Sequence, residues 1–163
     1  MEAIVDRSMT FNGLLETGVR IVMLLNSSFP KNYDLQRLTA LDYLLIHTSL
    51  LGGPKDSHPK TPIKTPLTQV RRETIQHAIN LMISRNLILQ NVLPDGIYYS
   101  AGDSSTFFVE SFQSSYLKDL NMRAKWLHGF FKNFTEREFE TKMNTILEDW
   151  IAEFQEPDFY LKS

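Results

Sequence analysis

The chain has 163 residues, of which 42% are hydrophobic, 22% charged and 12% aromatic, which predicts one folded domain around an ordinary core. Its net charge of −2 argues against a protein that coats nucleic acid by charge alone, and the lack of cysteine excludes disulfides, a thiol nucleophile and thiolate metal sites. No apolar run reaches the roughly 18 residues of a membrane span, and the N-terminus lacks the apolar stretch of a signal peptide, so we expect a cytoplasmic protein with no membrane contact.

Two helices are predicted in the N-terminal part of the chain. Apolar residues at helical spacing predict the first over residues 11–27, and Phe29-Pro30 ends it, because the residue before proline avoids the helical region. Asp34 is a good N-cap for the second helix, which has leucines along one face. Gly52-Gly53-Pro54 is expected to stop this second helix.

One irregular stretch, residues 52–66, follows these helices. It contains four of the seven prolines of the chain. A loop of this length in a small domain is usually functional or disordered. Because proline also restricts the unfolded chain, we expect this loop to be ordered and extended.

A third helix and a β-hairpin come next. Thr65-Pro66 supplies an N-cap followed by proline at the first helical position, and the helix is expected to run to about Arg85. Asn86 suits the left-handed residue that closes a helix. Residues 87–92 and 97–101 are predicted to be strands, joined by a turn containing proline, aspartate and glycine.

The rest of the chain is predicted to be helical. A short helix is expected to begin near Asp103 or Ser104, and apolar residues from Leu117 to Phe131 follow a helical pattern. Thirteen of the nineteen aromatic residues fall within 107–160. This density is typical either of a partner surface with aromatic anchors or of a well-filled core.

The last helix has a clear start signal. Thr135 and Glu138 have the spacing of a capping box, and Phe134 and Phe139 have that of a hydrophobic staple. Apolar residues from Phe139 to Phe154 then give this helix one apolar face.

The order of elements defines the predicted fold class: mainly α with a small β-hairpin. Three helices followed by a hairpin over 11–101 predict a winged-helix domain with a long loop at 52–66, and residues 102–156 form C-terminal helices packed on it or on a partner. The candidate DNA contacts are Lys60, Lys64, Arg71 and Arg72. An acidic turn at the hairpin tip and the long loop before the third helix argue against specific DNA recognition.

Charge is unevenly distributed along the sequence. Residues 55–85 carry six basic and two acidic side chains, whereas residues 134–163 carry eight acidic and three basic ones. The near-neutral total therefore conceals a basic middle and an acidic C-terminal part, which are either two solvated faces or two surfaces for different partners.

The sequence shows no catalytic constellation. Its four histidines have no metal-ligand spacing, and no nucleotide-binding or nucleophile motif is present, so we expect neither enzymatic activity nor a cofactor. His58 lies in the irregular loop, where an acid–base role is the less favoured interpretation. We expect Asp42, His47 and Glu73 to form an internal polar cluster that fixes this loop.

A series of motifs runs along the chain: Leu41–His47, Gly52-Gly53-Pro54, His58-Pro59, Val70–Glu73, Ser84–Ile88, Tyr116-Leu117, Leu120, Arg123-Ala124, Trp126, Trp150 and Glu153-Phe154. These motifs resemble a known family, the second type of middle component of bacterial ABC-three component systems. The resemblance covers about residues 11–155. Asp56-Ser57 and Asn86 depart from it, because the family tends to have an apolar residue before the His-Pro pair and often glycine at the position of Asn86.

The resemblance implies a non-catalytic subunit that bridges an ATPase related to SMC and Rad50 proteins to an effector, often a nuclease. Such systems, including Lamassu-type ones, resemble defences against phage and plasmids, and weak DNA contact through the complex fits this role. We expect the partner interface to include the loop from Gly52 to Thr65 and the face around Tyr116, Arg123 and Trp126. Its candidate residues are His58, Tyr116, Arg123, Trp126 and Trp150.

A second hypothesis belongs to a different class. The element order and the paired arginines of the third helix also fit a winged-helix transcription regulator that dimerises through its C-terminal helices. Sequence-specific DNA binding would discriminate this regulator from an assembly subunit.

Overall fold

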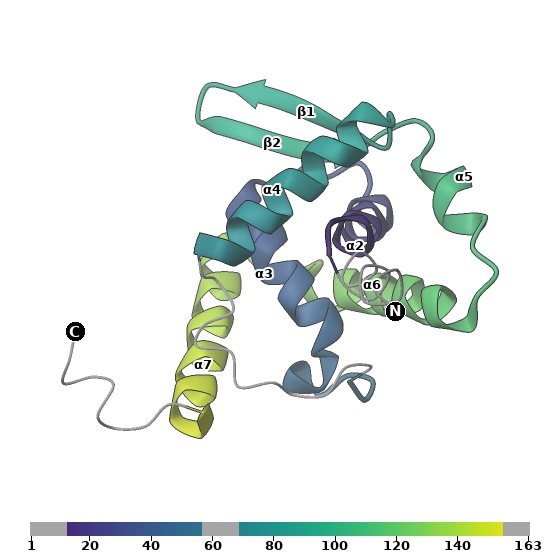
Figure 1. Ribbon diagram of the computed structural model, residues 1–163. Helices are drawn as coiled ribbons and strands as arrows, with labels where there is room; N and C mark the ends of the chain where they lie inside the picture. The colour runs from purple at the N-terminus through teal and green to yellow at the C-terminus, as the bar shows by residue number, and fades with distance from the viewer. Residues whose placement is uncertain (1–12, 57–68, 155–163) are drawn as a thin grey trace.

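The computed structural model describes residues 13–56 and 69–154. Within them the chain forms six α-helices, one 3₁₀ helix and one antiparallel hairpin, as predicted for a mainly helical protein (Figure 1). The elements are α2 (Leu14–Ser27), α3 (Leu35–Ile46), η1 (Thr48–Leu51), α4 (Gln69–Ser84), β1 (Ile88–Leu93), β2 (Gly96–Ala101), α5 (Ser105–Glu110), α6 (Ser115–Phe131) and α7 (Glu136–Phe154). None of the helices in this described part is long and apolar enough to cross a membrane.

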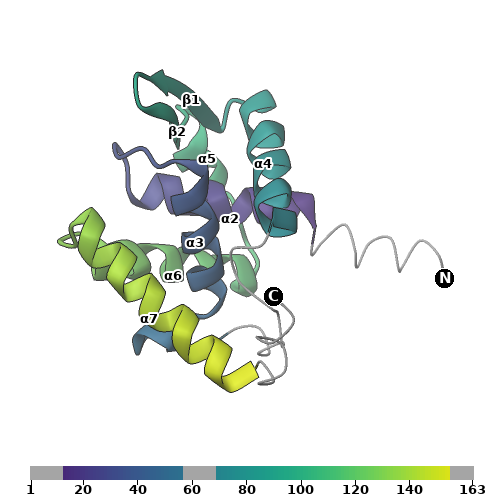
Figure 2. The ribbon, with the colours of Figure 1, turned by 90° about the vertical axis from the view of Figure 1, so that its left-hand side faces the viewer.

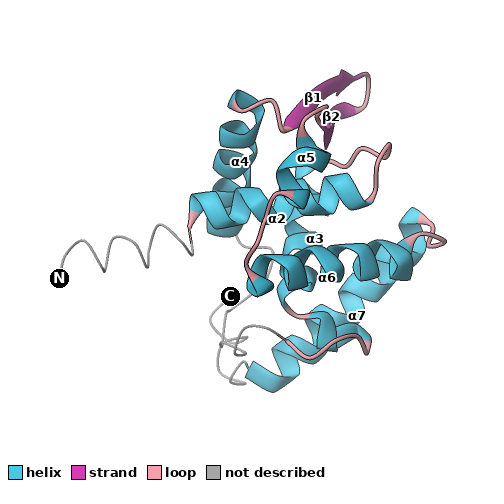
Figure 3. Cartoon of the chain, turned by 90° about the vertical axis from the view of Figure 1, so that its right-hand side faces the viewer, coloured by secondary structure: helices cyan, strands magenta, loops and turns pink. Residues whose placement is uncertain are grey.

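Helix α2 runs through the middle of the molecule. It contacts α3, α4, α5, α6 and β2, and its side chains are buried on every face from Glu16 to Leu25. Figures 2 and 3 show it from opposite sides, enclosed by the other helices. Gly18 allows α4 to approach closely, because a Cβ at that position would lie 2.5 Å from the Met82 side chain. A helix that is buried all round forms the core of a domain.

The second helix begins where the sequence predicts but ends earlier, at Ile46 instead of at Gly52. The Asp34 carboxylate accepts a hydrogen bond from the backbone N–H of Arg37, which satisfies one of the free donors of the first turn. After α3 the chain makes the short turn η1, which ends at Gly52, whose φ of 72° lies in the left-handed region that glycine adopts without strain. Residues 57–66 of the predicted loop, including the Thr65-Pro66 cap, lie outside the described residues.

The hairpin is confirmed, with Leu93 paired to Gly96 across the turn and Ile88 paired to Ala101 at its base. Asn86 adopts the predicted left-handed conformation, with φ of 62°, between α4 and β1. Tyr33, just before α3, forms a single bridge with Tyr99 of β2 through two backbone hydrogen bonds of 2.9 and 2.8 Å. This bridge attaches the hairpin to the helical body.

Aromatic packing joins α6 to α7. The rings of Phe134 and Phe139 each lie 4.9 Å from the ring of Phe131, so the predicted staple is made through a third phenylalanine. The capping box is confirmed: Thr135 N donates to Glu138 Oε1 at 3.2 Å, and Glu138 N donates to Thr135 Oγ1 at 3.1 Å. Much of the aromatic density of this region therefore serves internal packing.

One side chain of α3 holds the start of α7. The Arg37 guanidinium lies 3.6 Å from the centre of the Phe139 ring and pairs with Glu136 at 2.6 Å. Stacking an arginine on an aromatic ring while it also binds a carboxylate fixes the relative position of the two helices. Helix α7 then extends along the lower side of the molecule, away from the hairpin (Figure 2).

Candidate partner-binding site

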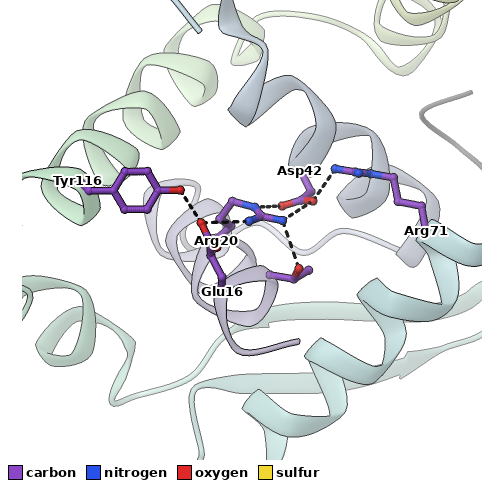
Figure 4. Close-up of polar contacts among 6 residues, drawn as sticks. Glu16, Arg20, Asp42, Arg71 and Tyr116 are labelled. Carbon is purple, nitrogen blue, oxygen red and sulfur yellow. Dashed lines mark hydrogen bonds and ion pairs between the residues drawn. The ribbon is translucent and has the colours of Figure 1, made fainter. Parts of the chain in front are cut away.

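A network of buried charges connects four helices (Figure 4). Arg20 of α2 binds Asp42 of α3 through two hydrogen bonds, Nε to Oδ1 at 2.7 Å and Nη2 to Oδ2 at 3.2 Å. Arg71 of α4 reaches the same carboxylate, with its Nη2 2.8 Å from Oδ2. The bidentate contact matches the planar guanidinium to the carboxylate, which is the strongest geometry available to this pair.

The two arginines make the burial of Asp42 tolerable. Asp42 is 1% exposed. Removal from water alone would raise the pKa of its carboxyl, but Arg20 and Arg71 outweigh that effect and lower the pKa below its usual value. Asp42 is therefore ionised in the folded protein at neutral pH, and it links α2, α3 and α4.

The network extends to α6 through a tyrosine. The Tyr116 hydroxyl donates a short hydrogen bond to Glu16 Oε1, and the same oxygen lies 3.7 Å from Arg20 Nη1. Burial and the neighbouring Glu16 carboxylate raise the pKa of Tyr116, so its phenol remains a proton donor. Tyr116 thus closes the network on the α6 side.

A second polar group fixes the start of the irregular loop. We call residues 47–56 the loop anchor. The Asp56 carboxylate accepts from the backbone N–H of Ser49 at 2.9 Å and lies 3.3 Å from Nδ1 of His47. Thr48 Oγ1 donates to the carbonyl of Pro54 at 2.6 Å, and Gly53 N donates to the carbonyl of Thr48 at 3.0 Å. These bonds fold the anchor back onto the end of α3.

Helix α6 supports the loop anchor with two side chains. Arg123 pairs with Asp119 at 2.6 Å and donates through Nη1 to Thr48 Oγ1 at 2.8 Å. Trp126 lies flat against the backbone at Gly53, where an added Cβ would come within 2.4 Å of the indole ring. The position of the anchor therefore depends on α6, which lies more than 60 residues further along the chain.

The predicted cluster of Asp42, His47 and Glu73 is divided by these contacts. Asp42 binds the two arginines, whereas His47 faces Asp56, and Glu73 is exposed on α4. Residues five apart on a helix point about 140° away from each other, so Asp42 and His47 face different surroundings. His47 does hold the loop, with Asp56 in place of the predicted acids.

Several of the candidate site residues point into the protein. Tyr116, Arg123 and Trp126 hold internal partners, and the Arg71 guanidinium is directed at Asp42, whereas Arg72 is exposed on α4. Arg71 turns inward because a buried carboxylate requires compensating charge. His58, Lys60 and Lys64 lie outside the described residues, and so does the side chain of Trp150, which belongs to α7.

The structure adds a surface that the sequence interpretation missed. Four apolar residues of the hairpin are exposed: Leu89 (47%), Val92 (74%), Leu93 (41%) and Ile97 (48%). The sequence around the turn could have identified them. Apolar residues flank the turn on both strands and on both faces of the hairpin, so they cannot all face the core. Over residues 88–101 the only charged side chain is that of Asp95.

The described residues contain no group of three His, Cys, Asp or Glu side chains that could hold a metal ion. A cleft of about 560 Å³ between α3 and α7 is lined by Tyr33, Arg37, Phe139 and Met143, but Arg37 is already paired there with Glu136. The polar networks hold helices and the loop anchor in position.

A comparison with protein families identifies the chain. The family model described as "ABC-three component (ABC-3C) system Middle Component 2" matches residues 10–153. The chain belongs to this family. The family resemblance expected from the motifs is thereby confirmed, and a middle component of a multi-component system implies protein partners.

Comparison of this Middle Component 2 chain with curated proteins and with solved structures gave no match. Inferences about its role therefore rest on the family match and on the geometry described above.

Proposed function

We propose that the chain is a non-catalytic accessory subunit that bridges an SMC- or Rad50-like ATPase to an effector, such as a nuclease, in a Lamassu-like complex that defends a bacterial cell against phage or plasmids. The observation that carries this proposal is the family match over residues 10–153. The family is described as a Middle Component of a three-component system, and we infer the bridging role from that description.

Two surfaces of different chemistry support a bridging role. The tip of the hairpin carries exposed apolar side chains, and α7 runs away from the hairpin below it (Figure 1). Three acidic residues of α7, Glu138, Glu140 and Glu148, are exposed. An apolar surface and an acidic surface favour partners of different chemistry.

Co-expression tests the proposal directly. The tagged chain would be produced together with the two proteins encoded beside it, and the purified material analysed by size-exclusion chromatography with mass detection. We expect both neighbours to co-purify, and we expect ATPase activity only when the neighbouring ATPase is present. Co-purification with neither neighbour would refute the bridging role.

A second candidate function is DNA binding by a winged helix, and one observation favours it. Helices α2, α3 and α4 are followed by the hairpin, which is the element order of a winged helix. The bridge between Tyr33 and Tyr99 adds one residue pair beside β2, and Arg72 is exposed on α4. Against it, the hairpin has no basic residue and Arg71 binds Asp42. Phosphate contacts require cations at the surface.

A mobility-shift series separates the two functions. A regulator would bind one DNA sequence above others, and Arg72→Ala would cost about 1–3 kcal/mol of that binding. We expect no sequence preference for the isolated chain. A preference that Arg72→Ala abolishes would establish the regulator instead.

A further inference from the structure

The outer side of strand β1 is an open sheet edge. In the described part of the chain the sheet has two strands, and β1 runs along the upper margin of the molecule in Figure 1. The backbone groups of Tyr99 bond Tyr33, outside the hairpin, so Tyr99 and its partner Gln90 exchange no hydrogen bonds. By the alternation of antiparallel pairing, the N–H and C=O groups of Ile88, Gln90 and Val92 point away from β2. Ile88 is buried, whereas Gln90 and Val92 are exposed, so the edge is open from Gln90 to the turn.

Among the residues that the structure describes, nothing gives this edge the usual protection. Natural proteins block exposed edges with lysine, proline, bulges or a covering helix. Strand β1 has the sequence Ile-Leu-Gln-Asn-Val-Leu, without charge or proline, and it pairs with β2 in unbroken register. Val92 and Ile97 lie directly opposite each other and extend the apolar face beyond the core.

The low charge of the hairpin indicates which class of ligand it can bind. Asp95 is its only charged residue, so phosphate groups of nucleic acid find no cation there. An open edge flanked by apolar side chains is suited to an extended peptide, since backbone hydrogen bonds supply affinity and alternate side chains supply specificity.

We propose that β1 accepts a strand from another protein component of the same system. The segment is extended and rich in β-branched and apolar residues, and it adds to the hairpin as a third strand beside the exposed part of β1, Gln90–Leu93. This inference rests on the proposed function, because membership in a multi-component system is what makes a different protein, rather than a second copy of this chain, the occupant.

Substitutions at Val92 test the edge itself. Val92→Pro removes one outward N–H without removing a hydrogen bond to β2, whereas Val92→Thr keeps both the N–H and the branched shape. Each variant would be co-expressed with the two neighbouring components, and binding measured by titration of the purified proteins. We expect Val92→Pro to weaken binding to one component at least tenfold and Val92→Thr to leave it within twofold.

Two controls separate the outcomes. Met122→Lys places a charge on a residue of α6 that is equally well exposed, and it should bind as the wild type does. Circular dichroism and thermal unfolding show whether Val92→Pro remains folded. If it does not, Val92→Lys, which leaves the backbone unchanged, takes its place and should reduce binding by the same factor.

The results distinguish the two proposals. Unchanged binding by folded Val92→Pro overturns strand addition but leaves the accessory role intact. No binding of the wild-type chain to either component overturns both. A dimer of the isolated chain that Val92→Pro dissociates would show that a second copy occupies the edge, and this also overturns the proposal.

Discussion

Asp42 shows how a single residue can organise several helices. A carboxylate at 1% exposure is stable only while Arg20 and Arg71 both face it, and those partners come from positions 22 residues earlier and 29 residues later. Breaking one side of a buried ion pair leaves an uncompensated charge, which costs about 3–5 kcal/mol. The network therefore makes the packing of α2, α3 and α4 mutually dependent.

Asp42→Asn is expected to destabilise the fold by about 3–5 kcal/mol and to change its pH dependence. Because the pKa of Asp42 is lowered on folding, its contribution to stability is complete above the unfolded pKa of about 3.9 and disappears as pH falls through the lower folded value. Urea unfolding between pH 2.5 and 7 measures this. Asp103→Asn, at an exposed site, should behave as the wild type does.

Tyr116→Phe removes the hydroxyl that donates a hydrogen bond to the buried carboxylate of Glu16. The ion pair with Arg20 at 3.7 Å is kept. We expect a loss of about 1–2 kcal/mol, since a hydrogen bond to a charged group contributes about 1.5–3 kcal/mol and partial exposure reduces it. The matched control is Tyr98→Phe, whose hydroxyl donates to Asp95 on the surface and whose loss should matter far less. Equal losses in thermal unfolding would argue against a buried network.

At the scale of elements, local signals made the fold largely predictable. The Asp34 cap, the Thr135–Glu138 capping box, Asn86 and the hairpin turn all act within a few residues, and the structure contains each of them. The site was less predictable, because its contacts span long separations such as Arg123 to Thr48. Charge counting assigned Arg71 to the surface, whereas burial of Asp42 turns it inward.

The contact between the loop anchor and α6 leads to a prediction at this scale. Gly53→Ala places a methyl group within 2.4 Å of the Trp126 ring, so the ring or the loop must shift. Overpacking of this kind costs about 1–3 kcal/mol, and the loop anchor should become more open to proteolysis. Limited proteolysis and thermal unfolding measure both effects.

Gly129→Ala is the control for that change. Its position in α6 has nothing within 4 Å of the added Cβ, and alanine is favoured over glycine inside a helix by about 0.5–1 kcal/mol. This variant should be as stable as the wild type or slightly more so. A destabilisation equal to that of Gly53→Ala would mean that Trp126 is not the cause.

At the scale of the whole molecule, the apolar hairpin and the acidic helix α7 predict different salt responses. Binding through the hairpin buries apolar groups and forms backbone hydrogen bonds. Salt screens interactions between exposed charges, and it therefore has little effect on a contact of this kind. We expect affinity for the component that occupies β1 to change less than about threefold between 50 and 500 mM NaCl. Titration at four salt concentrations tests this, and a tenfold decrease would point to α7 as the main contact.

Tyr99 gives the hairpin a mechanical property. Its backbone is bonded to Tyr33, its hydroxyl contacts Gln76 of α4, and its ring is buried, so the base of the hairpin is held from two sides. A receptor that is already rigid loses little conformational entropy when it is occupied. The base of the hairpin formed by β1 and β2 is therefore preorganised for binding.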